Sequence, residues 1–404
     1  MSRGPSPSTL PKAILAALAG DPAIAGARAF AQQAAADAAP DELPELSTVD
    51  LGANLADFWR FGERRRGRGP TIRVVPAINA EALDRLEIVQ DDAPFLVDSI
   101  MGEIAEQGLS VRALFHPIVK VQRDRAGVRG ATGLARRESM IQVFLDRVGG
   151  DREAALARGV TETLKDVRAA VDDFPQMQAL MAETLAELKA HTARSRPEEV
   201  AFLEWLEASQ FVFLGARVYE YPRLKSGDYA PEEPLYQAKD GLGVLRDPSR
   251  TVLRRANEPA ILMGKMKDRL ITDPALTIAK SNVRSRVHHR GYMDYVGIKV
   301  FGPGGVVTGE IRIIGLFTSA SVAVPNRDVP LIRRKISAVL EHSGTTPDSH
   351  AGKALLQALD TYPRDELFQI GIDDLQEFAT AIASLTDRPR VRVLPRIDRF
   401  DNFV

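Results

Sequence analysis

The chain has 404 residues, no cysteine, and 53 basic against 54 acidic residues, which leaves a formal charge of -1. This balance gives no electrostatic field for holding nucleic acid or an anionic membrane. The lack of cysteine excludes disulfides, thiol nucleophiles and thiolate zinc sites, and no run approaches the about 18 apolar residues of a membrane span. The length and the 45% of apolar residues predict two or three domains, and we expect a cytoplasmic protein.

Residues 1–70 are predicted to form a helical lead. The segments "AILAALAG", "GARAFAQQAAADAA" and "LGANLADFWRFGERR" are rich in helix formers, with breaks at Pro40 and Pro44. The run "RFGERRRGRGP" at 60–70 could bind phosphate, but it has no interleaved aromatic residues and the chain has no overall positive charge. We therefore interpret this run as a solvated linker.

Residues 71–194 are predicted to form a first α+β module. "TIRVV" and "RLEIVQ" are β-branched runs typical of strands. In the helix that follows them, Leu96, Ile100 and Ile104 recur every four residues. "SVRALFHPIVKVQRD" and "SMIQVFLDRV" indicate two further strands, and a long helix from about 152 to 191 should be kinked by Pro175.

The turn before the first helix of this module carries the sequence "DDAPFL". Asp91 and Asp92 are interpreted as charges that favour the helix N-terminus, and Pro94 is expected in the first helical turn. His116 precedes a proline in a strand and is interpreted as a packing or hydrogen-bonded residue. No serine, histidine and acid constellation has sequence support.

Residues 195–325 are predicted to form a second α+β module with an antiparallel sheet. It opens with "PEEVAFLEWLEAS", continues as a strand in "QFVFLGARVYEY", and ends in the hairpin "GYMDYVGIKVFGPGGVVTGEIRIIG". "GLGVLRD" at 241–247 is a loop or a short strand. No complete G-x-G-x-x-G or P-loop occurs in the chain, so we expect no cofactor in this segment.

The hairpin is expected to turn at 303–304, which places Phe301 opposite Val306. Val296, opposite Ile311, and Ile298 then lie on an apolar face that should meet the core. Tyr295, Lys299 and Arg312 then share a polar face with Glu310, where Tyr295 opposes Arg312 and Lys299 lies diagonal to Glu310. Because polar strand faces are normally solvated or salt-bridged, we interpret this face as structural, with a small-ligand pocket as the alternative.

His288 and His289 precede the hairpin. As neighbours in a strand they would point to opposite faces, so they could not hold one metal together, and no third ligand at zinc spacing is visible. Tyr292 and Asp294 share one side of the strand, and Tyr295 lies on the other. We therefore expect no catalytic residue and no metal site, and the rival reading is a self-contained enzyme that uses the 288–294 region for acid–base chemistry.

Residues 326–388 are predicted to form a helical connector, from "VPLIRRKISAVLEHSG" through "DDLQEFATAIASL". The stretch 389–404, "PRVRVLPRIDRFDNFV", alternates like a strand that begins a further module. We therefore expect the natural chain to continue past Val404.

Several of these segments together resemble the N-terminal, non-catalytic part of the large bacterial NAD-specific glutamate dehydrogenases. The resemblance runs from about 85 to 370 and is carried by "DDAPFLVDSI", "LFHPIVKVQRD", "FLEWLEASQFVFLGARVYEY", "KSNVRSRVHHRGYMDYVGIKVF", "GEIRIIGLFTS", "PLIRRKI" and "SHAGKALLQALDTYPRDELFQ". It implies an α+β chain with an ACT-like split βαβ module at 71–194, a PAS-like module at 195–325, a helical connector, and a second ACT-like module that starts at 389.

The resemblance also implies a regulatory and oligomerisation role. In such a family the catalytic domain that oxidises glutamate with NAD lies beyond residue 404, and the full chain forms a homo-oligomer, in this case a tetramer. A free-standing small-molecule sensor remains the alternative. Amino-acid-binding ACT domains commonly carry Asp-x-Pro-Gly before the first helix, whereas here Phe95 stands in the glycine position. A packing or subunit-contact role for that turn is therefore at least as well supported as amino-acid binding.

If an amino-acid or organic-acid effector binds this segment, two places are expected to contact it. The candidate residues lie in the turn before the first helix and on the polar face of the hairpin: Asp92, Pro94, Phe95, Leu96, Tyr295, Lys299 and Arg312.

Overall fold

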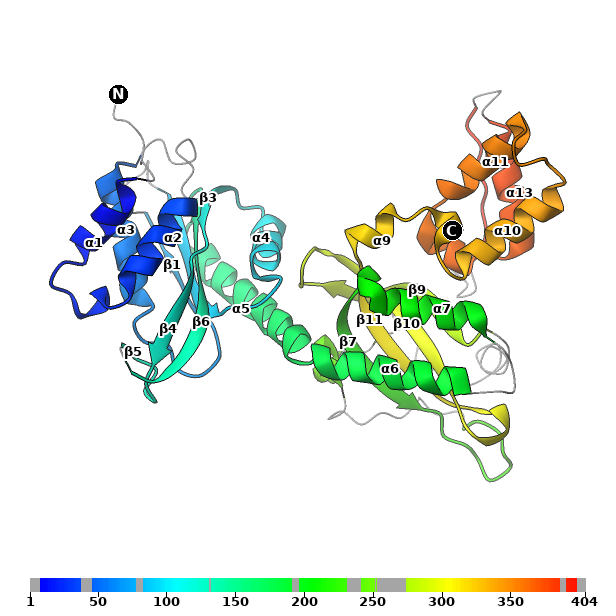
Figure 1. The fold of residues 1–404 in the computed structure, drawn as a ribbon, viewed down its shortest axis with the longest axis horizontal. Helices are drawn as coiled ribbons and strands as arrows, with labels where there is room; N and C mark the ends of the chain where they lie inside the picture. Colours follow the sequence, from blue (N-terminus) through cyan, green and yellow to red (C-terminus); the bar gives the residue numbers. More distant parts are fainter. Residues whose placement is uncertain are drawn as a thin grey trace. The chain divides into compact units, whose positions relative to one another are not determined.

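A computed structural model describes residues 8–37, 46–77, 83–130, 132–190, 196–230, 241–250, 252, 274–385 and 390–397. The chain divides into two compact units (Figure 1). Unit 1 comprises Met1–Arg168 with Arg286–Arg290, and unit 2 comprises Ala169–Ser285 with Gly291–Val404. None of the helices within the described ranges combines the length and apolar character needed to cross a membrane.

Unit 1 begins with three helices that fulfil the prediction of a helical lead. They are α1 (Leu10–Ala17), α2 (Ala27–Asp37) and α3 (Thr48–Phe61). Phe30 packs edge-on against Phe58, with ring centroids 6.2 Å apart, and Trp59 is fully buried beside them. The indole of Trp59 donates a hydrogen bond to the Ala23 carbonyl, which ties α3 to the turn before α2.

The sheet of unit 1 is antiparallel and runs in the order β1-β2-β6-β4-β5, with β3 also paired to β6. Its strands are β1 (Thr71–Val75), β2 (Asp84–Asp91), β3 (Val111–Phe115), β4 (Ile118–Arg123), β5 (Arg129–Gly130) and β6 (Leu134–Leu145). Helix α4 (Leu96–Glu106) connects β2 to β3, and β6 lies between those two strands. This arrangement is the split βαβ unit that the sequence predicts.

The predicted long helix is divided at Asp173. Helix α5 (Gly150–Asp172) ends there, and α6 (Phe174–Ala190) begins on the next residue. Pro175 cannot donate a backbone hydrogen bond and its ring disfavours helical backbone in the residue before it. The predicted kink at Pro175 is therefore confirmed.

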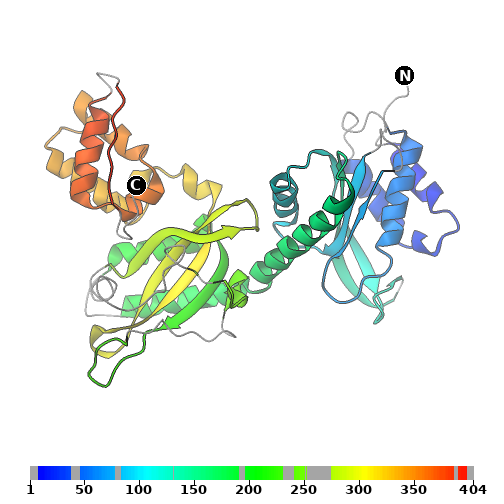
Figure 2. The same cartoon turned by 180° about the vertical axis from the view of Figure 1, so that it is seen from behind.

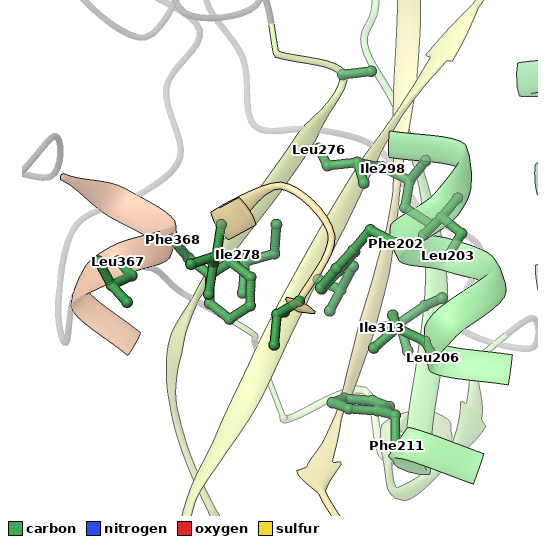
Figure 3. Packing of buried hydrophobic residues seen from close by; sticks show 14 of the residues in the cluster. Phe202, Leu203, Leu206, Phe211, Leu276, Ile278, Ile298, Ile313, Leu367 and Phe368 are labelled. Atoms are coloured by element: carbon green, nitrogen blue, oxygen red, sulfur yellow. The ribbon is translucent and has the colours of Figure 1, made fainter. Parts of the chain in front are cut away.

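Unit 2 contains a five-stranded antiparallel sheet in the order β8-β7-β11-β10-β9 (Figure 2). Its strands are β7 (Phe211–Glu220), β8 (Leu242–Gly243), β9 (Leu276–Ser285), β10 (Gly291–Phe301) and β11 (Val307–Phe317). Helix α6 and helix α7 (Pro197–Trp205) supply apolar side chains to one face of this sheet. In Figure 3, Phe202 and Leu203 of α7 lie beside Ile298 and Ile313 of the sheet.

The region after the sheet is helical, as predicted for the connector. It contains α9 (Ser319–Ala323), α10 (Ile332–Ser343), α11 (His350–Asp360), α12 (Arg364–Gln369) and α13 (Ile372–Ala383). Phe368 of α12 stacks on Phe317 of β11, with centroids 6.0 Å apart. Lys335 donates hydrogen bonds of 2.8 to 3.1 Å to the carbonyls of Leu367, Phe368 and Ile370, so the C-terminal end of α12 is capped by a cation.

The register of the β10–β11 hairpin differs from the prediction by two residues over most of its length. Val296 pairs with Ile313 rather than Ile311, and Phe301 pairs with Val307 rather than Val306. The connection is longer than expected because a 3-10 turn at Pro303–Gly305 and a bulge at Val300/Phe301 separate the strands. A shift of two residues leaves every side chain on its predicted face, since the side-chain period of a strand is two.

The strand expected at 389–404 is not present in the part of it that the structure describes. Residues 390–397 form no regular strand, and 389 and 398–404 lie outside the described residues. Val391 and Val393 are exposed, whereas Leu394 packs against the core of unit 2. The proposed start of a second ACT-like module stays a prediction.

Candidate functional sites

The first predicted effector site is the β2–α4 turn of unit 1. Helix α4 begins at Leu96, which is buried, and Pro94 lies exposed in the turn before it rather than in the first helical turn. Phe95 is the N-cap residue, with φ 67° and ψ 5°, and its side chain makes no capping hydrogen bond. The expected position of Pro94 in the helix is therefore wrong by two residues.

Phe95 adopts the left-handed backbone conformation that glycine favours. For a residue with a Cβ this conformation costs roughly 1–2 kcal/mol, so the surrounding contacts must hold it. The Ser99 hydroxyl donates to the Phe95 carbonyl at 2.5 Å, and the His288 amide donates to the same hydroxyl at 2.9 Å. The turn therefore keeps the backbone shape of the glycine motif, while an aromatic ring lies where the motif has only hydrogen.

Residues 286–290 belong to unit 1 and form a loop, not the strand that the sequence suggested. His288 has φ 67°, so the rings of His288 and His289 do not point to opposite faces but lie 5.0 Å apart, edge to face. The His288 ring nitrogen lies 3.0 Å from the carboxylate of Asp98, and the Phe95 ring is 5.4 Å away. Among the described residues, no three acidic or histidine side chains are arranged to hold a metal.

Asp92 is not the helix-terminal charge that the sequence suggested. Its carboxylate accepts a hydrogen bond from the Ser139 hydroxyl at 2.8 Å and lies 3.1 Å from the Arg137 guanidinium. Asp91 likewise points to an arginine, Arg65, with which it forms a close ion pair. Both acids therefore connect β2 to neighbouring segments, and the acid in the first turn of α4 is Asp98.

The structure also brings together a histidine, a serine and an acid that the sequence gave no reason to group. His116 Nε2 lies 3.0 Å from Ser139 Oγ, which in turn donates to Asp92. Burial lowers the pKa of His116, with Asp37 and Asp92 opposing that effect, and Ser139 is fully buried. Because the hydroxyl proton points to the acid rather than to the imidazole, this chain is not a nucleophile with its base.

The run 60–70 is the expected solvated linker only in part, because residues 63–64 and 66–68 are exposed whereas Gly62 and Arg65 are buried. The side chain of Arg65 is fully buried, and its Nε lies 3.1 Å from the carboxylate of Glu138. Arg123 makes two hydrogen bonds of 2.7 Å to the same carboxylate and three more to the carbonyls of Gly62, Glu63 and Gly127. These contacts fasten the segment after α3 to the ends of β4 and β6.

The second predicted effector site is the polar face of the sheet in unit 2. Tyr295 and Tyr221 donate to the two carboxylate oxygens of Glu310 at 2.7 and 2.9 Å, and Arg312 Nε donates at 3.0 Å. Glu310 is only 3% exposed. Of the two structural alternatives, solvated or salt-bridged, this face is the salt-bridged one, because it is buried and its polar groups bind each other.

Arg312 is held in this cluster from two further directions. Its guanidinium lies 3.8 Å from the centroid of the Tyr219 ring and donates to the Val252 carbonyl at 3.2 Å. Burial alone would lower the pKa of Arg312, but Glu310 and the tyrosines around it raise that pKa above its ordinary value. The pair therefore stays charged inside the protein, where a single unpaired charge would be costly.

The structure brings Tyr295 and Arg312 together through Glu310 and places Lys299 directly across the strand pair from Glu310 rather than on a diagonal. Tyr219 and Tyr221 were not among the predicted residues; Tyr219 lies in β7, the strand that neighbours β11, and Tyr221 follows the end of β7. Their alternation in "ARVYEY" is the signal that could have found them. The other four predicted residues, 92 and 94–96, belong to unit 1.

A second charged cluster of unit 2 contains Asp294, the acid that the rival enzyme hypothesis uses. Asp294 is buried, and Lys280 Nζ lies 2.6 Å from its carboxylate and 3.3 Å from that of Asp365. Burial raises the pKa of Asp294 to about 6, although Lys280 lowers it and Asp365 adds to the rise. Tyr292, on the same strand, is largely exposed and is separated from Asp294 by a bulge in the β9–β10 pairing.

Two family models match parts of the chain. The model of the glutamate dehydrogenase ACT1 domain matches residues 30–160, which include most of α2, all of α3 and the whole sheet of unit 1. The model of the glutamate dehydrogenase helical motif 1 matches residues 329–388, which include α10 to α13. The helical connector thus coincides with a recognised segment of glutamate dehydrogenases.

The chain is also similar to curated proteins over most of its length. It is 32% identical over 382 residues to the NAD-specific glutamate dehydrogenase of Halomonas elongata, and 32% identical over 411 residues to that of Pseudomonas aeruginosa. The same enzyme of Mycobacterium tuberculosis is 25% identical over 366 residues. These matches cover 87 to 95% of this chain and 21 to 24% of the relatives, so the chain spans about a quarter of their length.

Proposed function

The chain belongs to the NAD-specific glutamate dehydrogenase family, as an N-terminal segment of it, and from this membership we propose a regulatory and assembly role without chemistry of its own. The whole protein would convert L-glutamate, NAD and water to 2-oxoglutarate, ammonia and NADH in the cytoplasm. NAD would bind in a catalytic domain outside residues 1–404. The partners of this segment would be other copies of the chain, in a tetramer of the full-length protein, and an amino-acid or organic-acid effector.

The observation that supports a non-catalytic role is the closure of the polar clusters. Glu310 uses both carboxylate oxygens on Tyr295, Tyr221 and Arg312, and Ser139 is fully buried between His116 and Asp92. Acid–base catalysis needs a group within hydrogen-bond reach of a substrate atom. Side chains that bind one another inside the protein serve packing and rigidity instead.

The finer architecture is part of the proposal. Residues 71–194 would be the first ACT-like module and 195–325 a PAS-like module, followed by the connector 326–388 and the start of a second ACT-like module at 389–404. In order of appearance the strands of the second sheet lie as 2-1-5-4-3, with the first strand inside the sheet, which is compatible with a PAS-like module. An effector that bound either module would act by preferring one arrangement of the full-length enzyme over another.

The first test asks whether this segment has catalytic activity. The purified chain, supplied with L-glutamate and NAD, is expected to form no NADH. In the full-length protein, His289→Ala and Asp294→Asn together are expected to leave turnover within about twofold, whereas loss of an acid–base pair would lower it roughly a hundredfold or more. Turnover by the isolated chain, or such a loss in the double variant, would favour the rival enzyme hypothesis.

The proposed regulatory role, binding of an effector, has a separate test. Isothermal titration of the chain with L-glutamate, L-aspartate and 2-oxoglutarate is expected to give saturable heat for at least one of them. No heat at millimolar ligand would remove the effector from the proposal and leave assembly alone. Light scattering on the chain and on the full-length protein then measures self-association.

A further inference from the structure

We propose that the Asp294 cluster of unit 2 ties the helical connector to the sheet in a proton-dependent way, because the ammonium of Lys280 moves from Asp294 to Asp365 when Asp294 becomes protonated. The cluster consists of one residue from each of three elements: Lys280 of β9, Asp294 of β10 and Asp365 of α12. The inference goes beyond the proposed function and does not depend on it, since it concerns how α12 packs within this chain.

Lys280 lies between the sheet and helix α12. It pairs with Asp294 across the β9–β10 ladder, and its Nζ lies 2.6 Å from a carboxylate oxygen of Asp294. The same Nζ lies 3.3 Å from the carboxylate of Asp365, an acid in the first turn of α12. Since β9 is at the edge of the sheet and α12 packs against it, one ammonium serves the sheet and the connector at the same time.

Two carboxylates compete for this one ammonium, and they differ in exposure. The side chain of Asp294 is 5% exposed, whereas those of Lys280 and Asp365 are 45% and 50% exposed. A buried carboxylate close to a second carboxylate is costly to ionise, since it loses hydration and meets a like charge. Asp294 is therefore the acid of the cluster that takes up a proton from solvent most readily.

The charged groups around Asp294 agree with this assignment. Burial raises the pKa of Asp294 to about 6 and Asp365 of α12 adds to the rise, while Lys280 of β9 and a backbone hydrogen bond from Phe317 of β11 lower it. Burial alone would lower the pKa of Lys280, but Asp294 and Asp365 raise that pKa above its ordinary value. When the pH passes through about 6, Asp294 therefore exchanges a proton with solvent while Lys280 stays an ammonium.

Protonation of Asp294 changes which acceptor Lys280 prefers. An ammonium binds a carboxylate more strongly than a neutral carboxyl group, because the ion pair adds a Coulombic attraction. The flexible stem of lysine lets its ammonium move toward Asp365, and the repulsion between the two carboxylates disappears. The contact between β9 and α12 is therefore stronger at low pH, and at high pH Asp294 weakens it by competition.

The charged neighbours of Asp365 within α12 have partners of their own. Arg364 donates to two backbone carbonyls in and after α9, and Glu366 forms an ion pair with Arg396, whose side chain is 8% exposed. Lys280 is therefore the cation whose position responds to the protonation of Asp294. Through Glu366 and Arg396, the packing of α12 also affects how segment 390–397 is held.

The test measures hydrogen exchange of α12 in the whole 404-residue chain at about pH 5 and about pH 7.5, with each rate divided by the intrinsic chemical rate at that pH. Peptides that cover 364–370 are expected to be protected at least about threefold more at the lower pH, because opening of α12 then breaks the stronger Lys280–Asp365 contact. Equal protection of α12 at the two pH values would overturn the inference.

Three variants complete the test. Asp294→Asn mimics the protonated acid and should give α12 high protection that no longer depends on pH. Asp365→Asn removes the acceptor on α12 and should also abolish the pH dependence, with low protection at both pH values. Asp373→Asn, which changes an exposed acid in the first turn of α13, is the matched control and should keep the pH dependence of the parent chain.

The Asp365→Asn variant decides the outcome even if Asp294→Asn does not fold. Because Asp365 is half exposed, its substitution should leave the fold intact, which circular dichroism checks. A pH dependence of α12 that persists in Asp365→Asn, or in a folded Asp294→Asn protein, would overturn the inference. Loss of the pH dependence in Asp373→Asn as well would do the same, because the effect would then not be specific to the Asp294 cluster.

Discussion

The two units each bury an arginine–carboxylate cluster, but the clusters are balanced differently. In unit 2, Glu310 faces one arginine and two tyrosine hydroxyls, and burial closes the group from solvent. In unit 1, Glu138 serves two buried arginines and Asp91 serves three, two of them at an exposed rim. Both clusters tie neighbouring strands of their own sheet together, but only the unit 1 cluster extends from the buried core to exposed side chains.

The largest effect is expected from Glu138→Gln in unit 1. This change leaves Arg65 and Arg123 buried without their shared anion, and breaking a buried ion pair costs about 3–5 kcal/mol. The chain has two tryptophans, and Trp59 lies in unit 1, so denaturant unfolding of a Trp205→Phe background reports on this unit by fluorescence. The exposed Glu162 provides the control, since Glu162→Gln should change stability by less than about 0.5 kcal/mol. A loss below about 1 kcal/mol for Glu138→Gln would contradict the buried network.

In the Asp294 cluster the carboxylates outnumber the cations, because two carboxylates share Lys280. The pKa of Asp294 is raised from 3.8 to about 6 in the folded state, so between these pH values the folded protein holds more protons than the unfolded chain. Its contribution to stability is therefore complete below about pH 4 and is lost as the pH rises through 6. Asp294→Asn should remove this slope and stabilise unit 2 at pH 7 by no more than about 3 kcal/mol, with the loss of the Lys280 contact as an offset.

Unfolding curves from pH 4 to pH 7, followed through Trp205 in a Trp59→Phe background, measure this difference. Asp348→Asn, which changes an exposed acid of the same unit, is the control and should change the slope little. A steeper pH dependence in Asp294→Asn than in the parent chain would show that the sign is wrong.

The closed cluster of unit 2 also depends on a glycine. A Cβ at position 297 would lie 2.4 Å from a carboxylate oxygen of Glu310 and 2.6 Å from the Tyr295 hydroxyl. Gly297→Ala should therefore destabilise unit 2 by about 2–3 kcal/mol, as overpacking of a buried site does. Gly291→Ala, on the same strand with open space around its Cβ position, is the control. Equal stability of the two variants would mean that the cluster is looser than the distances indicate.

The sequence predicts what depends on local pattern. Alternation placed Val296 and Ile298 on the apolar face of the hairpin, and Pro175 marked the break between α5 and α6. The hairpin register was missed by two residues because it depends on the backbone of a five-residue connection, where Gly304 has φ 74°. Hydrophobic periodicity carries no information about that conformation.

Ion pairs between residues far apart in the chain were the other feature that the sequence could not predict. The burial of Arg65 depends on Asp91 and Glu138, which are 26 and 73 residues away, so a run of arginines read alone suggests a solvated segment. The polar face around Glu310 was left as solvated or salt-bridged for the same reason, because its partner Tyr221 is 89 residues away, just after a strand whose pairing the sequence does not specify. For the Arg65 segment and for the Glu310 face, the charged residues could be named from the sequence, but whether they are buried with partners or exposed to solvent could not.

The smallest effect compares two tyrosines of β10. Tyr295 is 1% exposed and donates to Glu310 at 2.7 Å, whereas Tyr292 is 57% exposed. Tyr295→Phe removes one donor from a buried carboxylate that keeps Tyr221 and Arg312, so we expect a loss of about 1.5 kcal/mol, typical of a hydrogen bond to a charged group. Tyr292→Phe should change the free energy of unfolding by less than about 0.5 kcal/mol. Since both substitutions remove one hydroxyl from the same strand, urea unfolding of the two variants isolates the contribution of the closed cluster, and equal losses would show that Glu310 is accessible to water.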